Sequence, residues 1–183
     1  WLLKFKIMRF NQIILGAIVL AESCLSGYSQ TKKLIHDNTF NGYAYTADGG
    51  KMEPSQQFKI QNGTIYLSGD KPGYLMGKVL FFFFLLTMEY RWNDAETKRT
   101  TTKRNAGVMY HIPAEAKDTL WPQGIQFQIK DNATGDFVLL QNTTLKVDGQ
   151  LQGPGKSVVV KRSAGDEKPS GEWNSIKIVA KGQ

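Results

Sequence analysis

Apolar and polar residues alternate without a break in the segment 124–131. The apolar positions are Ile125, Phe127 and Ile129, and the polar positions are Gln126, Gln128 and Lys130. Because successive side chains of a strand point to opposite faces, this pattern predicts a strand with one face in a core and the other facing outward. Glutamine amides both donate and accept hydrogen bonds, so the polar face suits a ligand covered in hydroxyl groups, such as a sugar. An ordinary solvated strand face is the alternative interpretation.

The rest of the chain after residue 30 also predicts β-structure. Asn62-Gly63 lies between the strand-like segments 58–61 (FKIQ) and 64–67 (TIYL) and is a strong signal for a hairpin. The segment 86–92 alternates as well, with four residues on its apolar face: Leu86, Met88, Tyr90 and Trp92. Further strands are expected at 108–112, 124–130, 137–140, 144–147, 157–162 and 173–180. Many short strands separated by turn residues indicate an all-β antiparallel sandwich or barrel.

Two other segments affect the fold prediction. The segment 79–86, VLFFFFLL, is too short to span a bilayer and predicts a strand buried on both faces, with an error in the reading frame as the alternative. The segment 114–119 predicts at most one helical turn. With 183 residues the chain has room for one domain with its own core.

Residues 1–29 resemble a secretory signal peptide. Met8 to Gln12 form a short positive segment, 13–20 (IILGAIVL) is apolar, and small residues up to Ser29 provide a cleavage site. Met8 is the expected start of translation. We therefore predict an exported mature domain at 30–183, without a transmembrane span.

Cys24 supports a competing interpretation of the same leader. A lipidated Cys24 would anchor the mature protein to a membrane, whereas cleavage after Ser29 would release a soluble one. The chain has no second cysteine, so no intrachain disulfide and no thiol nucleophile are expected in the mature domain.

The formal net charge of +7 does not by itself indicate nucleic-acid binding. The basic residues are spread over many loops, and no compact basic helix or aromatic–basic motif accompanies them. A solvated, mildly basic surface is favoured, and no nucleic-acid partner is expected.

Candidate chemical groups are few. The two histidines, His36 and His111, have no Cys or His neighbours at metal-ligand spacing, so no metal cofactor is expected. Oxygen ligands at Asp131, Asn132 and Asp136 allow a structural calcium site, although these residues also favour turns without a metal. His111 suits either a structural or a proton-transfer role, and Asp131 either a turn or a catalytic role.

Six segments in the correct order resemble the 3-keto-disaccharide hydrolase domain family. They are FNG at 40–42, FKIQNGTI at 58–65, GYLM at 73–76, NAGVMYH at 105–111, QFQIKD at 126–131 and GEWN at 171–174. The resemblance implies a concanavalin A-like β-sandwich, a jelly roll exported to the periplasm or cell-envelope surface of a Gram-negative bacterium. It also implies action on 3-keto-glycosides, with the sugar bound on the concave sheet.

The resemblance gives candidate roles to seven residues. Asp131 and His111 are the expected proton-transfer groups, and the expected sugar-binding residues are Asn105, Tyr110, Gln126, Gln128 and Trp121. The family often has Glu where this chain has Gln126, and an amide is not a general acid or base. A non-catalytic carbohydrate-binding module is therefore the alternative function. The family usually continues with further strands, so we expect strands beyond Gln183.

Overall fold

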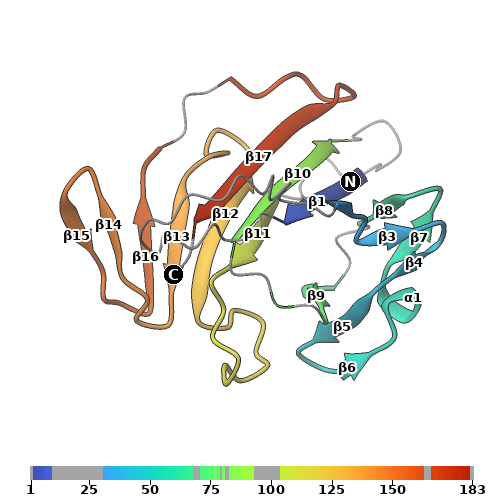
Figure 1. Cartoon of the computed structure of the whole chain (residues 1–183), viewed down its shortest axis with the longest axis horizontal. Coiled ribbons are helices and arrows are strands. Elements are labelled where there is room, and N and C mark those ends of the chain that lie inside the picture. The colour runs from blue at the N-terminus through green and yellow to red at the C-terminus, as the bar shows by residue number, and fades with distance from the viewer. Residues whose placement is uncertain are drawn as a thin grey trace, which may run out of the picture.

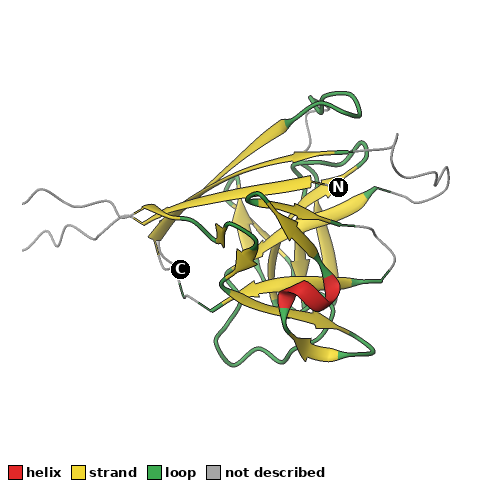
Figure 2. Cartoon of the chain, turned by 90° about the vertical axis from the view of Figure 1, so that its right-hand side faces the viewer, coloured by secondary structure: helices red, strands yellow, loops and turns green. Residues whose placement is uncertain are grey.

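The computed structural model describes residues 2–9, 31–67, 71–78, 80, 83–92, 104–162 and 166–181, the side chains of 2–9, 31 and 32 excepted. Within them the chain is almost entirely β-structure in antiparallel sheets, and Figure 2 shows a single short helix among the strands. The predicted all-β sandwich is confirmed.

The largest sheet has the strand order β17-β10-β1-β8-β7. These strands are β17 (Asn174–Lys181), β10 (Phe83–Arg91), β1 (Leu2–Arg9), β8 (Thr64–Tyr66) and β7 (Lys59–Gln61), and β2 (Thr31–Lys32) pairs with β1. The long strands β10 and β17 lie side by side in Figure 1 and pair from Phe83↔Lys181 to Tyr90↔Asn174.

The second sheet has the order β11-β12-β13-β16. Its strands are β11 (Asn105–Tyr110), β12 (Gly124–Lys130), β13 (Phe137–Leu140) and β16 (Ser157–Val160). The predicted strands at 124–130 and 137–140 have the predicted bounds.

Smaller sheets flank these two (Figure 1). One contains β5 (Gly42–Thr46), β6 (Gly50–Met52) and β9 (Gly73–Gly77), in the order β6-β5-β9. The hairpins β3 (Ile35–His36) with β4 (Thr39–Phe40) and β14 (Leu145–Val147) with β15 (Gln150–Gln152) complete the sheets. The helix α1 (Pro54–Gln57) has proline at its first position, where the missing N–H is not needed, and the Glu53 N–H donates to Gln56 Oε1.

The main core lies between the two large sheets. Alternate residues of β10 and the following Trp92 face it, β17 contributes from the same sheet, and β12 contributes from the opposite sheet. The buried members from these elements are Phe84, Leu86, Met88, Tyr90, Trp92, Ile176, Ile178, Ala180 and Ile129. The predicted apolar face of 86–92 is thus confirmed.

The hairpin at Asn62-Gly63 is confirmed too. Gln61 pairs with Thr64, so the loop has two residues, and both have positive φ, 50° at Asn62 and 69° at Gly63. Two positive φ values define the type I′ turn, whose twist matches that of the flanking strands. Glycine is favoured at the second position because it has no Cβ to strain.

The phenylalanine-rich segment differs from the prediction. Residues 79, 81 and 82 lie outside the described part, and Leu80 is exposed. From Phe83 onward, β10 is buried on one face only, because every second residue faces the partner sheet while Phe83 and Leu85 are half-buried on the other face. The segment 114–119 forms no helix.

Most of the leader falls outside the described residues, including the apolar segment 13–20, Cys24 and Ser29. Leu2–Arg9 forms β1, which pairs along its length with β10. The signal peptide, the start at Met8 and the lipid anchor stay predictions. Within the described residues, no helix is long and apolar enough to cross a bilayer.

Candidate functional site

The two faces of β12 have different partners. Ile129 packs in the main core together with Phe127, and Ile125 packs in a smaller cluster with Leu139 and Val160. The opposite face of β12 carries Gln126 and Gln128. Directly paired residues of an antiparallel ladder lie on the same face, so Gly107 and Met109 of β11 share this outer face with the two glutamines.

Three amide side chains form a continuous hydrogen-bonded row on the outer face. Gln126 Nε2 donates to Gln128 Oε1 at 2.6 Å, and Gln128 Nε2 donates to Asn105 Oδ1 at 2.6 Å. The row crosses from β12 to the first residue of β11. Each amide keeps further donor or acceptor capacity beyond these bonds, which is the capacity a polyhydroxylated ligand requires. We call these three residues the amide row.

Gly107 makes room for the amide row. A Cβ at this position would lie 2.5 Å from Gln126 Cγ and 2.7 Å from both Cδ and Nε2 of that side chain. Such distances are far inside van der Waals contact, so any larger residue would displace Gln126. A glycine inside a strand commonly marks such a close approach, and this was the available sequence signal for Gly107.

The outer face of β12 differs from an ordinary solvated strand face, which the sequence left open as the alternative interpretation. Gln128 is only 7% exposed, and Gln126 is half-buried. Opposite Gln128 the backbone of β13 enters a bulge, in which Gly135 N–H donates to Gln128 O and Gln128 N–H donates to Asp136 O. Gly135 has φ 103°, as a glycine at the first position of such a bulge requires.

The backbone of Asp136, which is paired with Gln128, carries a buried carboxylate. The sequence allowed this residue as a turn residue, a calcium ligand or an acid–base group. Asp136 is 1% exposed, its Oδ1 accepts from Arg162 N–H at 2.7 Å, and its Oδ2 lies 3.4 Å from Lys161 Nζ. These interactions connect the start of β13 to the end of β16. Asp136 therefore fixes the backbone next to the amide row.

The Gln126 end of the row is bordered by the connection 111–123, which joins β11 to β12. His111, the residue after Tyr110, has a positive φ of 51°. The Tyr110 and His111 rings lie edge to face, with their centroids 5.3 Å apart. Trp121 is 54% exposed, and its carbonyl accepts a hydrogen bond from Gln141 Nε2 at 3.2 Å. The connection leads into β12 at Gly124, where φ 151° and the absent Cβ allow the chain to pass close to Ile112.

The side chain of Tyr110 is on the core face of β11, opposite the face that carries the amide row. It packs against both hydrophobic clusters, and desolvation raises the pKa of its hydroxyl to about 12. A neutral, partly buried tyrosine on the core face is separated from the amide row by the sheet itself. Tyr110 is therefore not brought together with Gln126 and Gln128.

The Asn105 end of the row is bordered by an ion pair. Asp131 Oδ1 lies 3.6 Å from Arg104 Nη1, and the Arg104 guanidinium lies 5.6 Å from the centre of the buried Trp92 ring. Because β12 rises about 3.3 Å per residue, Asp131 and His111 are separated by roughly 20 Å at opposite ends of the β11–β12 pair. The two expected proton-transfer residues therefore border opposite ends of the amide row.

Of the seven sequence-predicted residues, the structure thus brings together Asn105, Gln126 and Gln128. Their roles, and those of Asp131, His111, Tyr110 and Trp121, stay predictions. For the calcium site, no group of three or more His, Cys, Asp or Glu residues arranged to hold a metal ion occurs among the described residues. Two of its three expected ligands, Asp131 and Asp136, make the ion pairs given above, and this site also stays a prediction.

The all-β fold and the domain family of the chain together define a carbohydrate-related β-sandwich protein. The chain belongs to the family of 3-keto-α-glucoside-1,2-lyase-like domains, which matches residues 30–183. The family predicted from the six sequence segments is thus confirmed. No curated protein and no solved structure matches the chain significantly.

Proposed function

We propose that this protein binds 3-keto-glycosides on the amide row and cleaves them by elimination across C1 and C2. The observation that carries the proposal is the hydrogen-bonded row of Gln126, Gln128 and Asn105 on the outer face of a domain of this family. Aligned amides match a ligand whose hydroxyl and keto oxygens are spaced along a ring. Bonding among the amides holds them in place before the ligand arrives, which reduces the entropy lost on binding.

The chemistry follows from the ketone at C3. The ketone acidifies the C2–H bond, so a base removes that proton and the electron pair moves onto the C3 oxygen as an enolate. The enolate then re-forms the carbonyl, makes the C1–C2 double bond and expels the glycosidic oxygen, which takes up a proton and leaves as an alcohol. Addition of water to the resulting enone gives the 3-keto sugar, so the sum of both steps is hydrolysis. Amide N–H groups aimed at the C3 oxygen stabilise the enolate.

His111 is the proposed base. Imidazole is a common general base in enzymes, and His111 lies in the connection that borders the Gln126 end of the row. Asp131 is the weaker candidate because its carboxylate is held by Arg104. We assign Asp131 and Arg104 to the polar boundary at the other end, and Trp121 to a stacking surface for the second sugar.

A pair of histidine variants tests the base. His111→Asn keeps the positive φ, which asparagine tolerates well, but removes the imidazole. We expect it to lower kcat on 3-keto-trehalose at least a hundredfold, measured by glucose release and by the absorbance of the enone. His36→Asn is the matched control, since His36 is exposed on the β3–β4 hairpin. Equal activity of the two variants would remove His111 from the mechanism.

A non-catalytic sugar-binding module is the second candidate, favoured by Gln126 at the position where the family often has a carboxylate. The wild-type protein distinguishes the two functions. Turnover of 3-keto-trehalose with no action on trehalose supports the enzyme. Saturable binding of both sugars without product supports the module, and Gln128→Ala should then abolish binding.

We further propose that the protein is exported, because the segment 8–29 has the charge and apolar pattern of a signal peptide. Mass spectrometry of the protein from the cell envelope tests this. A chain that begins at Gln30 supports a soluble exported form, and a lipid on Cys24 supports an anchored one. An intact leader in the purified protein would contradict export through this signal.

A further inference from the structure

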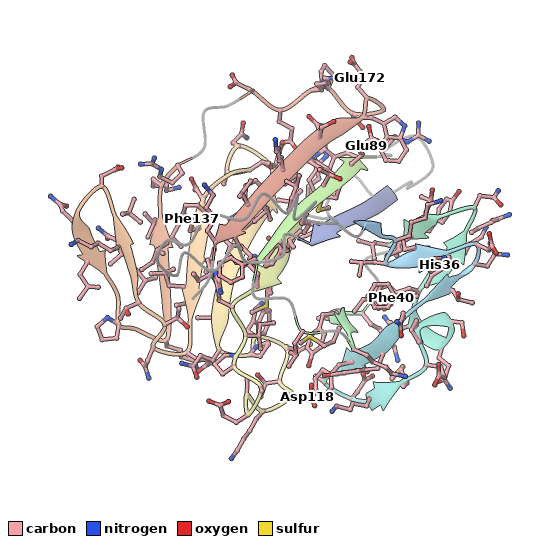
Figure 3. The ribbon with its side chains drawn as sticks, in the orientation of Figure 1. His36, Phe40, Glu89, Asp118, Phe137 and Glu172 are labelled. Carbon is pink, nitrogen blue, oxygen red and sulfur yellow. The ribbon has the colours of Figure 1, made fainter. Side chains whose placement is uncertain are left out.

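A second polar cluster lies apart from the amide row, around Asp118 in the middle of the connection 111–123. Asp118 Oδ1 accepts hydrogen bonds from Tyr43 Oη at 2.7 Å and Tyr74 Oη at 2.8 Å, and Asp118 Oδ2 lies 2.7 Å from Lys51 Nζ. Figure 3 shows Asp118 beside the sheet that contains β5, β6 and β9. One carboxylate therefore binds all three strands of that sheet: Tyr43 is on β5, Lys51 on β6 and Tyr74 on β9.

The partners of Asp118 share one face of the small sheet. Tyr45 pairs with both Tyr74 and Lys51, and Tyr43 is two residues before Tyr45, so these side chains all point to the same side. The Tyr45 and Tyr74 rings stack at 5.2 Å, and Lys51 Nζ lies 4.6 Å from the Tyr43 ring centre. The other side of the sheet faces the core, where Ala44 and Thr46 are buried.

The electrostatics of the cluster favour a charged Asp118. Desolvation alone raises the pKa of Asp118, but the hydrogen bonds from Lys51, Tyr43 and Tyr74 outweigh it, and the net pKa lies below 3.8. Desolvation and then the bond to Asp118 raise the pKa of both Tyr43 and Tyr74, so both remain donors at neutral pH. Hydrogen bonds to a charged group are about twice as strong as neutral ones.

The segment fastened in this way is the one that borders the proposed sugar site. It starts at His111, contains Trp121 and leads into β12 at Gly124, two residues before Gln126. Connections of this length without regular structure are uncommon in compact domains and commonly functional. Its last part is held by Gln141 through the Trp121 carbonyl, and its middle by Asp118.

We propose that Asp118 is a positioning residue for the sugar site, because it fastens the connection 111–123 to the β5–β6–β9 sheet and so sets the places of His111 and Trp121. The positioning role rests on the proposed function; the fastening does not. Asp118 itself is not a catalytic residue, since its carboxylate is already engaged by three side chains.

Hydrogen exchange tests the fastening without any sugar. Asp118→Asn removes the charge at nearly constant shape, and the double variant Tyr43→Phe/Tyr74→Phe removes both hydroxyl donors while keeping the rings. We expect either change to speed amide exchange in 112–120 about tenfold. The control is Asp148→Asn, which makes the same chemical change at an exposed ion pair with Arg162 and should leave this segment unaltered.

Steady-state kinetics on 3-keto-trehalose test the positioning. Asp118→Asn should raise KM and lower kcat together, because both Trp121 and His111 lose their places. Asp118→Glu should recover part of both parameters, since it restores the charge. Thermal unfolding shows whether each variant is folded, and the tyrosine double variant provides the same test if Asp118→Asn fails to fold.

The possible outcomes test the fastening of the connection and the positioning role of Asp118 separately. Unchanged exchange in 112–120 for a folded Asp118→Asn variant overturns the fastening and with it the proposal. Faster exchange with wild-type KM and kcat overturns the positioning role. If the wild type neither binds nor cleaves the sugar, the proposed function and the positioning role both fail, while the exchange result still decides the fastening.

Discussion

Replacement of Gly107 by alanine probes whether the amide row is a built site. The new Cβ would lie 2.5 Å from Gln126 Cγ, so the Gln126 side chain must rotate away and lose its hydrogen bond to Gln128. Gln128 is 7% exposed, and a buried acceptor that loses its donor is destabilised by about 1–3 kcal/mol. Replacing glycine in an allowed strand conformation returns about 0.4–1 kcal/mol through the unfolded state.

The expected net effect of Gly107→Ala is a loss of about 1–2 kcal/mol from the free energy of unfolding. For a domain of this size, that loss lowers Tm by roughly 2–8 °C. Thermal and urea unfolding measure it, and titration with 3-keto-trehalose should show at least a tenfold weaker Kd. Gly77→Ala is the matched control, because a Cβ at Gly77 on β9 meets nothing within 4 Å.

A double-mutant cycle isolates the interaction between positions 107 and 126. In the Gln126→Ala background the new methyl group has no amide to displace, so Gly107→Ala should be neutral or slightly stabilising there. The coupling free energy between the two positions is then about 1–3 kcal/mol. An equal loss of stability in both backgrounds would refute the reasoning, since it would mean that the methyl group clashes with something other than Gln126.

Three further predictions concern the rest of the domain. Because the folded pKa of Asp118 is lowered, its stabilising effect is fully present above pH 3.8 and is lost as the pH falls through the folded pKa; NMR ring signals of its tyrosine partners should stay constant from pH 7 to about 4 and shift only below that. Ile129→Ala removes a side chain that is 1% exposed and should lower the unfolding free energy by about 2–5 kcal/mol in urea, whereas Val179→Ala at a half-exposed position should change it by less than about 0.5 kcal/mol. Gly63→Ala should lower Tm because φ 69° is strained for alanine, and an unchanged Tm would argue against the type I′ turn.

Local sequence patterns were sufficient for most strands. The alternation in 86–92 and 124–130 and the Asn62-Gly63 turn depend only on neighbours along the chain, and each matches the structure. Alternation also showed correctly which face of β12 is apolar. The burial of Gln128 was not predictable in this way, because it depends on neighbours that are distant in sequence, Asn105 and the bulge at Gly135-Asp136.

The candidate site was predictable in part for the same reason. Family resemblance drew attention to Asn105, Gln126 and Gln128, which the structure does join. It did not show that Tyr110 lies on the core face, because apolar and polar residues do not alternate clearly along β11. It also gave no indication of the Asp118 cluster, whose three partners come from residues 43, 51 and 74 and meet only after the small sheet has formed.

The amide row has a direction, and this direction has a consequence for ligand orientation. Each amide donates to the next, so the row starts with the Gln126 carbonyl oxygen and ends with the Asn105 amino group. Donors and acceptors are therefore presented in a fixed order along the sheet. A glycoside is also asymmetric, with a ketone that only accepts and hydroxyls that also donate, so only one of its two orientations matches that order. Under the proposed function, the row would thus select which end of a 3-keto-glycoside faces His111, through the polarity of three side chains.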